Sequence, residues 1–241
     1  MFSNIAANVG GSLSVVNTAN TTVASLTDNQ GTVSGVTAPG GVIINSTANT
    51  LTLNGIISAN TAGVDITLND NVFVNTVGSN VLSTGAGNFQ VWSGNPANDT
   101  LDGLVYNYKQ YDATYGSTAV LGTGNGLLYT VAPIITPVLT GTVSKVYDAT
   151  NNATLTSSNY TSSGAIDGDT IILNNPTSGT YDTVNVGSNL TVSVSGISIA
   201  SATNGSVTVY GYQVIPTANA AIGIITQRPI TISSNPGLSV N

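Results

Sequence analysis

Few residues of this chain could act as general acids, bases or nucleophiles. It contains no His, no Cys and no Glu, and only 3 Lys+Arg among 241 residues. Most general acid–base and nucleophilic catalysis uses His, Cys, Glu or Lys. The ten acidic residues are all Asp, and two pairs lie close in sequence, Asp99 with Asp102 and Asp167 with Asp169. Glycoside hydrolysis needs two carboxyls about 5–9 Å apart. Because both pairs lie in turns with Gly or Asn, where Asp usually bonds the backbone, we predict no catalytic residue and no enzyme.

Calcium is the metal that this chain is best equipped to bind, since Asp, Asn and carbonyl oxygens are its ligands. The stretch Ile166-Asp167-Gly168-Asp169 superficially resembles the start of a calcium loop. An EF-hand loop also needs a bidentate Glu, which the chain lacks, and the calcium-binding nonapeptide Gly-Gly-x-Gly-x-Asp is missing as well. The sequence therefore predicts no metal site and no cofactor.

Glycosylation is a further hypothesis, because Asn-x-Ser/Thr sequons are frequent. They begin at Asn20, Asn45, Asn98, Asn152, Asn159, Asn189 and Asn204. A chain this rich in Asn and Thr produces many such triplets by chance. If they are used, we expect them to lie in surface loops.

The composition excludes several classes of partner. Charged residues make up only 5% of the chain, far below the roughly 25% of soluble domains, so solubility must rest on Asn, Thr and Ser. The net charge of −7 argues against binding of nucleic acid or of anionic lipid, which need clustered Lys and Arg. No apolar run approaches the ~18 residues of a transmembrane helix, and residues 1–5 do not begin a signal peptide.

Alternating β-branched and small polar residues predict short strands from beginning to end. In the first part we expect strands at 12–16, 32–36, 41–44, 50–53, 64–68, 71–74 and 88–92, separated by Gly or Asn. An antiparallel sandwich and a parallel β-solenoid with coils of roughly 20 residues both produce this pattern, and we favour the solenoid for residues 1–90. Asn29, Asn49, Asn69 and Asn71 either stack as ladders at its corners or merely form turns.

Aromatic residues gather between positions 92 and 130. They include Trp92 and a cluster of tyrosines at Tyr106, Tyr108, Tyr111 and Tyr115. A solenoid needs an end cap because its last coil otherwise exposes apolar surface and an unpaired edge. We therefore interpret about 92–130 as a cap that completes a segment at 1–132, with a sugar-binding platform as the alternative.

A second unit is expected at residues 133–232, and 233–241 is expected to be a linker or the start of a further repeat. Strands are predicted at 142–147, 153–155, 169–173, 191–194, 206–210 and 222–225, and 224–232 looks like a closing strand. Turns about every ten residues favour a β-sandwich-like module. The sequence Lys109-Gln110-Tyr111-Asp112-Ala113-Thr114 returns as Lys145-Val146-Tyr147-Asp148-Ala149-Thr150, which suggests a reusable Tyr-Asp turn.

A series of short motifs runs through residues 145–230. They are 145–150, Asn159-Tyr160, Gly168-Asp169-Thr170, Gly179-Thr180-Tyr181, Asn185-Val186-Gly187 and 225–232. In this order they resemble the YDG-type repeats of giant bacterial surface proteins. The Tyr-Asp-Gly that names the family is Tyr147-Asp148-Ala149 here. If that Gly has a positive φ, the turn must differ, because Ala resists that conformation.

Residues 1–130 resemble the distal passenger segment of filamentous-haemagglutinin-like exoproteins, most closely at 92–100 and 103–111. The resemblance implies a secreted adhesin on the surface of a Gram-negative bacterium, exported by an outer-membrane partner in two-partner secretion. It offers no catalytic residues. It also allows glycosylation, since related high-molecular-weight adhesins carry glycans at such sites.

The functional expectation is a structural and adhesive stalk and spacer, with host or neighbouring-cell glycans or proteins as possible partners and no membrane insertion. One alternative is an extracellular filament subunit that self-associates through β edges, starting from Ile230-Thr231-Ile232. The other is a carbohydrate-active enzyme on a β-solenoid, which we consider the weakest.

Overall fold

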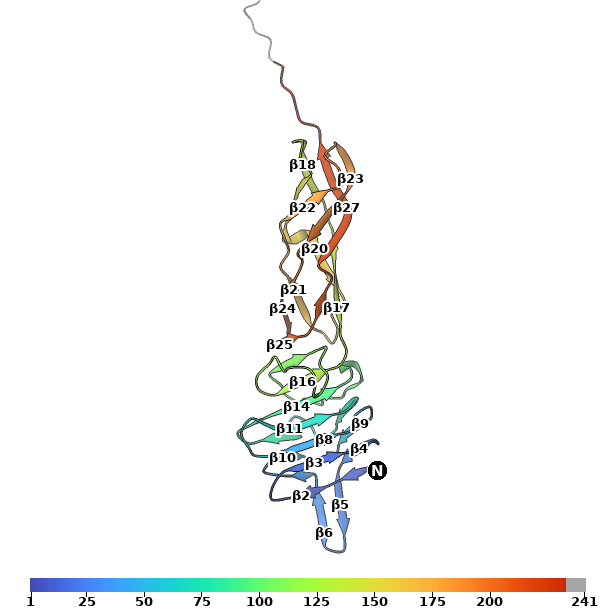
Figure 1. Ribbon diagram of the computed structural model, residues 1–241, viewed down its shortest axis with the longest axis vertical. Coiled ribbons are helices and arrows are strands. Elements are labelled where there is room, and N and C mark those ends of the chain that lie inside the picture. The colour runs from blue at the N-terminus through green and yellow to red at the C-terminus, as the bar shows by residue number, and fades with distance from the viewer. Residues whose placement is uncertain (233–241) are drawn as a thin grey trace, which may run out of the picture. The chain divides into compact units, whose positions relative to one another are not determined.

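The computed structural model describes residues 1–232 (Figure 1). Strands hold 50% of the residues and helices 3%, which confirms the all-β class. The helical turns are the 3-10 helices η1 (Pro96–Asn98) and η2 (Ser157–Asn159). Among residues 1–232 there is no helix long and apolar enough to cross a membrane. The predicted linker at 233–241 lies outside the described residues.

The chain divides into two compact units. Unit 1 comprises Met1–Ile135, Gly164–Ile172 and Ala200–Gln213, and unit 2 comprises Thr136–Ser163, Leu173–Ile199 and the residues from Val214 onward. Two segments of the later sequence therefore belong to the first unit.

Parallel ladders dominate unit 1. The first sheet contains β1 (Asn4–Ile5), β4 (Thr21–Val23), β9 (Thr50–Leu53) and β12 (Val72–Asn75). The second contains β2 (Ala7–Asn8), β7 (Val36–Thr37), β10 (Ile57–Ala59) and β13 (Leu82–Thr84). The third includes β3 (Leu13–Val16), β8 (Val42–Asn45), β11 (Val64–Asn69) and β14 (Asn88–Ser93), which are successive neighbours in Figure 1. In chain order, successive strands of these sheets belong to the first, second and third sheet in turn, and this order then repeats.

Period-2 alternation explains why these ladders form a core. In the third sheet Leu68 lies opposite Ile44 on one side and Val91 on the other, and all three are buried. In the first sheet Phe73 lies opposite Leu51, and both are buried as well. Because successive side chains point to opposite faces, equal registers bring apolar residues to the interior in every strand.

The predicted strand at 32–36 is interrupted in the structure. Gly35 has a φ of +66°, which breaks the run between β6 (Gly31–Ser34) and β7. β6 instead pairs antiparallel with β5 (Ser25–Asp28) in a hairpin, whose turn is held by Asp28 Oδ1 accepting from the backbone N–H of Gln30 at 2.7 Å. A glycine inside a strand pattern is therefore a bend here, as glycines often are.

Beyond β14 the third sheet continues with strands from distant parts of the sequence. They are, in spatial order, β16 (Gly126–Tyr129), β15 (Tyr108–Gln110), β25 (Val207–Tyr210), β24 (Ile199–Asn204) and β21 (Thr170–Leu173). β15 is parallel to both of its neighbours, β16 and β25, and all three of its residues are buried. This position places the side chain of Lys109 in the interior.

Unit 2 contains mixed and antiparallel pairings. One sheet has the order β18 (Val143–Val146), β27 (Thr217–Thr226), β23 (Gly187–Ser195), β22 (Ser178–Tyr181) and β19 (Asn152–Thr154). A three-stranded sheet has the order β20 (Tyr160–Ser163), β17 (Ile134–Leu139) and β26 (Gln213–Val214). The predicted closing strand at 224–232 is wrong beyond Thr226, where β27 ends. Pro229 has no N–H to donate to a ladder, and Ile230 and Ile232 are exposed.

Candidate functional site

A buried lysine between two aspartates is the most concentrated chemistry in unit 1. Lys109 projects from β15, and its side chain is 0% exposed. Its Nζ lies 2.6 Å from Asp167 Oδ2 and 2.5 Å from Asp169 Oδ1. The side chain of Asp169 is also 0% exposed, whereas that of Asp167 is 35% exposed. A charge removed from water needs close partners, and Lys109 has two.

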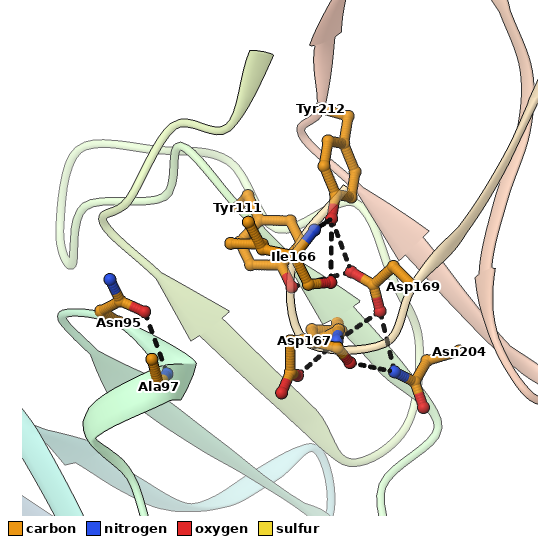
Figure 2. Close-up of polar contacts among 9 residues, drawn as sticks. Asn95, Ala97, Tyr111, Ile166, Asp167, Asp169, Asn204 and Tyr212 are labelled. Atoms are coloured by element: carbon orange, nitrogen blue, oxygen red, sulfur yellow. Dashed lines mark hydrogen bonds and ion pairs between the residues drawn. The ribbon is translucent and has the colours of Figure 1, made fainter. Parts of the chain in front are cut away.

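Asp169 is the best-satisfied acid of this site, as Figure 2 shows. Its Oδ2 accepts from the Tyr111 hydroxyl at 2.8 Å and from the Tyr212 hydroxyl at 2.9 Å. Its Oδ1 accepts from Asn204 Nδ2 at 2.8 Å. We call Lys109, Tyr111, Asp167, Asp169, Asn204 and Tyr212 the Lys109 cluster; all of them belong to unit 1.

The loop that carries the two aspartates is a tight turn with left-handed residues. Asp167 has a φ of +53° and Gly168 a φ of +70°, and the Asp169 N–H donates to the Ile166 carbonyl at 3.0 Å. The Tyr212 hydroxyl accepts from the Ile166 N–H at 2.9 Å. Asn204 Nδ2 also donates to the Asp167 carbonyl at 2.8 Å. These bonds fix the backbone of the turn that carries both carboxylates.

The tyrosine hydroxyls of the cluster are held in their protonated form. Burial, followed by the hydrogen bond to Asp169, raises the pKa of Tyr111 well above its usual range. Burial is also the main cause that raises the pKa of Tyr212 to about 12. The rings of Tyr111 and Tyr212 meet edge to face at 4.9 Å, and Lys109 Nζ lies 5.4 Å from the Tyr111 ring centre. Both hydroxyls therefore donate to Asp169 across the physiological pH range.

A second group of acids lies next to the end of β14. Asp99 Oδ1 accepts from the Phe73 N–H at 2.9 Å and from the Ser93 hydroxyl at 2.8 Å. Asp70 is buried, and neither of its oxygens has a hydrogen-bond partner among the described residues. Burial raises the pKa of Asp99 to about 6, and burial followed by the charge of Asp99 raises the pKa of Asp70 well above its usual range. Burial also raises the pKa of Tyr129, with the charge of Asp99 as the next cause.

The two aspartate pairs singled out in the sequence have different surroundings. Asp102 is exposed with a φ of +45°, while Asp99 bonds the neighbouring strands, so that pair does not act together. Asp167 and Asp169 do come together, but their side chains contact Lys109 rather than their own turn. The prediction that this second pair lies in a turn agrees with the structure, but the prediction that its side chains bond the backbone of that turn is wrong. Local sequence carried no signal for Lys109, which is distant in the chain.

The absence of a metal site and the glycosylation of the sequons both remain predictions. Within residues 1–232 there is no group of three or more acidic, His or Cys residues that could hold a metal ion. The sequon residues Asn20, Asn98, Asn152 and Asn189 are exposed. Asn159 is only 7% exposed and donates to the Thr140 carbonyl at 3.1 Å, so the expectation of a surface loop is wrong there. It is also wrong for the sequon residues that lie in strands, which are Asn45, Asn152, Asn189 and Asn204.

The tyrosines of 92–130 are used in internal packing. Tyr108 and Tyr111 are buried, and Trp92 meets Tyr115 edge to face at 5.6 Å. Tyr108 and Trp92 share a cluster with Leu128. Buried ring faces cannot stack on a sugar, so the Tyr108 and Tyr111 faces do not form the alternative sugar platform.

The Tyr-Asp turn of unit 2 contains a strained alanine. Ala149, which stands where the family name has Gly, has a φ of +63°, a conformation that Ala resists. Asp148 Oδ1 accepts from Lys145 Nζ at 2.8 Å and from the Thr150 N–H at 2.9 Å. The hydrogen bond from Lys145 is the main cause that lowers the pKa of Asp148 to about 2. The side-chain bonds hold the turn in place despite the strain at Ala149.

Replacing Ala149 with glycine is expected to raise the free energy of unfolding by about 0.5–1 kcal/mol, because glycine adopts a positive φ without the Cβ clash. Urea denaturation measures the change. Ala200→Gly is the matched control, since Ala200 is exposed within β24 and glycine should weaken a strand. Destabilisation by both substitutions would contradict the strain at residue 149.

Comparison with known proteins identifies part of the chain. No curated protein and no solved structure showed significant similarity to it. A family model, described as the YDG domain, matches residues 130–218. Asp167, Asp169 and Tyr212 lie inside this match, and Lys109 and Tyr111 precede it. The chain therefore contains a YDG domain at residues 130–218.

Proposed function

We propose that this chain is a non-catalytic structural and adhesive segment of a secreted bacterial surface protein. In this proposal residues 1–132 are a parallel β-solenoid that acts as a stalk, and the YDG domain acts as a β-sandwich-like spacer. The observation that carries it is the repeated visit of the chain to three parallel sheets, from β1 through β14. Continuous ladder hydrogen bonds along such a stack make it stiff, which suits a stalk.

Side-chain ladders and the aromatic region add support. Asn69 Nδ2 donates to Asn45 Oδ1 at 3.0 Å at paired positions of β11 and β8, as stacked corners of neighbouring coils would. Asn49 instead bonds its local turn, donating to the Thr47 carbonyl at 2.9 Å. The buried cluster of Trp92, Tyr108 and Leu128 joins β14, the last of the repeated strands, to β15 and β16, where a cap of the solenoid is needed.

The secreted, filamentous-haemagglutinin-like origin rests on the resemblance of residues 1–130 together with the YDG domain at 130–218. The charge-poor composition fits a surface hydrated by Asn, Thr and Ser. Under this proposal an outer-membrane partner exports the chain to the surface of a Gram-negative bacterium. Glycans or proteins of host or neighbouring cells are then its binding partners.

A filament subunit is the second candidate, and the exposed end of the described chain favours it. Ile230 is 84% exposed and Ile232 91% exposed, and neither lies in a strand. An unpaired apolar segment of this kind can add as a strand to the sheet edge of another copy.

Light scattering and electron microscopy over a concentration series distinguish the two candidates. The stalk proposal predicts discrete particles with the mass of one chain, 24.2 kDa, at every concentration. Ordered fibres that disappear when 227–232 is deleted would make assembly the function instead. If particles stay discrete, glycan arrays and binding to cells test adhesion. The Ile230→Asn variant is the control for non-specific hydrophobic binding.

A further inference from the structure

The Lys109 cluster has the arrangement of a reaction centre that acts on its own chain. A primary amine lies in contact with two carboxyls, one fully buried and one partly open to water. We infer that Lys109 and Asp169 condense into an amide cross-link within the folded protein, with Asp167 as the group that transfers protons. This inference goes beyond the proposed function and does not depend on it.

The geometry selects Asp169 as the acyl group. Lys109 Nζ lies 2.5 Å from Asp169 Oδ1, which is bonded to Cγ, so the amine is adjacent to the carbon that it attacks. The loop bonds and the buried strand β15 hold both groups in place. Positioning of this kind converts a slow bimolecular condensation into an effectively unimolecular one.

The two tyrosines Tyr111 and Tyr212 stabilise the negative charge that develops during the reaction. When Nζ adds to Cγ, negative charge develops on Asp169 Oδ2. That oxygen already accepts from the hydroxyls of Tyr111 and Tyr212, at 2.8 and 2.9 Å. Two preorganised donors on the developing charge form an oxyanion hole, which is usually the largest contribution to such a reaction.

Protons and oxygen balance without any added reactant. The Lys109 ammonium first gives a proton to Asp167 Oδ2, which lies 2.6 Å away. The free electron pair on Nζ then forms the C–N bond to Asp169 Cγ, and the C–Oδ1 bond breaks. Of the three ammonium protons, one stays on the amide nitrogen and two leave with Oδ1 as water, at least one of them through Asp167. Asp167 ends as the carboxylate that it was at the start.

Burial supplies the driving force. An ammonium and a carboxylate, each 0% exposed, carry a desolvation cost that their attraction repays only in part. The amide product is neutral, and water leaves through the partly open side at Asp167. Replacing two buried charges with one hydrogen-bonded amide therefore favours condensation at this site, whereas bulk water favours the separate ions.

Intact-mass analysis and a tryptic digest of the denatured full chain test the inference. The expected chain is lighter than its sequence by one water. Trypsin does not cleave after an amide-linked lysine, and Arg228 precedes Pro229, so only the bond after Lys145 is cut. The two halves then stay joined through Lys109 and Asp169. The full sequence mass, with free peptides 1–109, 110–145 and 146–241, would overturn the inference.

Ring closure at an Asp-Gly bond is the other route to the same mass, because Asp102-Gly103 and Asp167-Gly168 can each lose water. Such a chain would still be cleaved after Lys109, and that result would also overturn the inference. Fragmentation of the joined peptide must place the link at Asp169, and a link at Asp167 would contradict the assignment of roles.

Variants separate the chemistry from folding. Asp169→Ala and Lys109→Arg are expected to restore the full mass, and Asp167→Asn is expected to slow the loss of water. Lys145 and Asp148 provide the matched control, since they also form a close ion pair, at 2.8 Å, but their side chains are 16% and 53% exposed. Asp148→Ala should therefore keep the cross-link at Lys109. If the variants do not fold, the mass and digest of the unaltered chain still decide the question.

Discussion

Replacing Gly35 with alanine is expected to lower the free energy of unfolding by about 2–5 kcal/mol. Gly35 has a φ of +66°, and a Cβ at this position would lie 2.2 Å from the Ile56 carbonyl oxygen. That oxygen cannot move aside without cost, because it accepts the ladder hydrogen bond from the Val36 N–H at 2.9 Å. A Cβ added at Gly55 would in turn lie 3.0 Å from the Gly35 Cα, so the two glycines are in close approach. The substitution therefore forces neighbouring backbones apart.

Urea denaturation of three alanine variants separates the steric contribution from the conformational one. Gly63 also has a positive φ, +92°, but no atom lies within 4 Å of its Cβ position, so Gly63→Ala should cost only the left-handed strain of about 1–2 kcal/mol. Gly10 has neither constraint, and Gly10→Ala should change stability by less than about 0.5 kcal/mol. Equal losses for Gly35→Ala and Gly63→Ala would show that the backbones are not in close approach.

The longer strands of unit 1 could be predicted because alternation persists over enough residues to be seen. The expected strand at 50–53 coincides with β9, and that at 64–68 falls within β11. β10 and β13 were missed, since three residues such as Ile57-Ser58-Ala59 cannot display a period of two. Their neighbours in the parallel ladder, and not their own sequence, make them strands.

The Lys109 cluster could not be predicted for a related reason. Local pattern rules assign Asp167 and Asp169 to a turn, and that turn exists. What the rules cannot supply is that β15 passes next to this turn, because the partner residues are 58 positions apart for Lys109 and Asp167. Ala149 shows the converse limit: side-chain bonds from Asp148 override an unfavourable local preference.

Lowering the pH from 7 to about 4 is expected to stabilise unit 1, the reverse of ordinary acid denaturation. The folded-state pKa of Asp99 is about 6, raised by burial from a usual value of 3.8. Between these values the folded state binds more protons than the unfolded state, so the free energy of unfolding falls as the pH rises. The contribution is complete below pH 4 and is lost as the pH passes 6. A shift of this size corresponds to about 2–3 kcal/mol.

The surrounding groups reinforce this direction. The pKa of Asp70 is raised in the same sense, by burial and then by the charge of Asp99. The charge of Asp167 adds to the effect of burial in raising the pKa of Asp99. The hydrogen bonds from Phe73 and Ser93 oppose the shift without cancelling it. Asp148 acts in the opposite sense, but only as the pH falls from about 4 toward 2, which lies below the window of this experiment.

Asp99→Asn tests the origin of the effect, because the amide keeps an oxygen to accept from Phe73 and Ser93 while removing the charge. The Asp99 Oδ2 has no hydrogen-bond partner among the described residues, so no bond is lost there. The variant should be about 2–3 kcal/mol more stable than the unaltered chain at pH 7 and should show a flatter pH profile. Asp102→Asn, at an exposed site three residues on, should leave the profile as it was. A rise in the stability of the unaltered chain from pH 4 to 7 would show that burial does not govern Asp99.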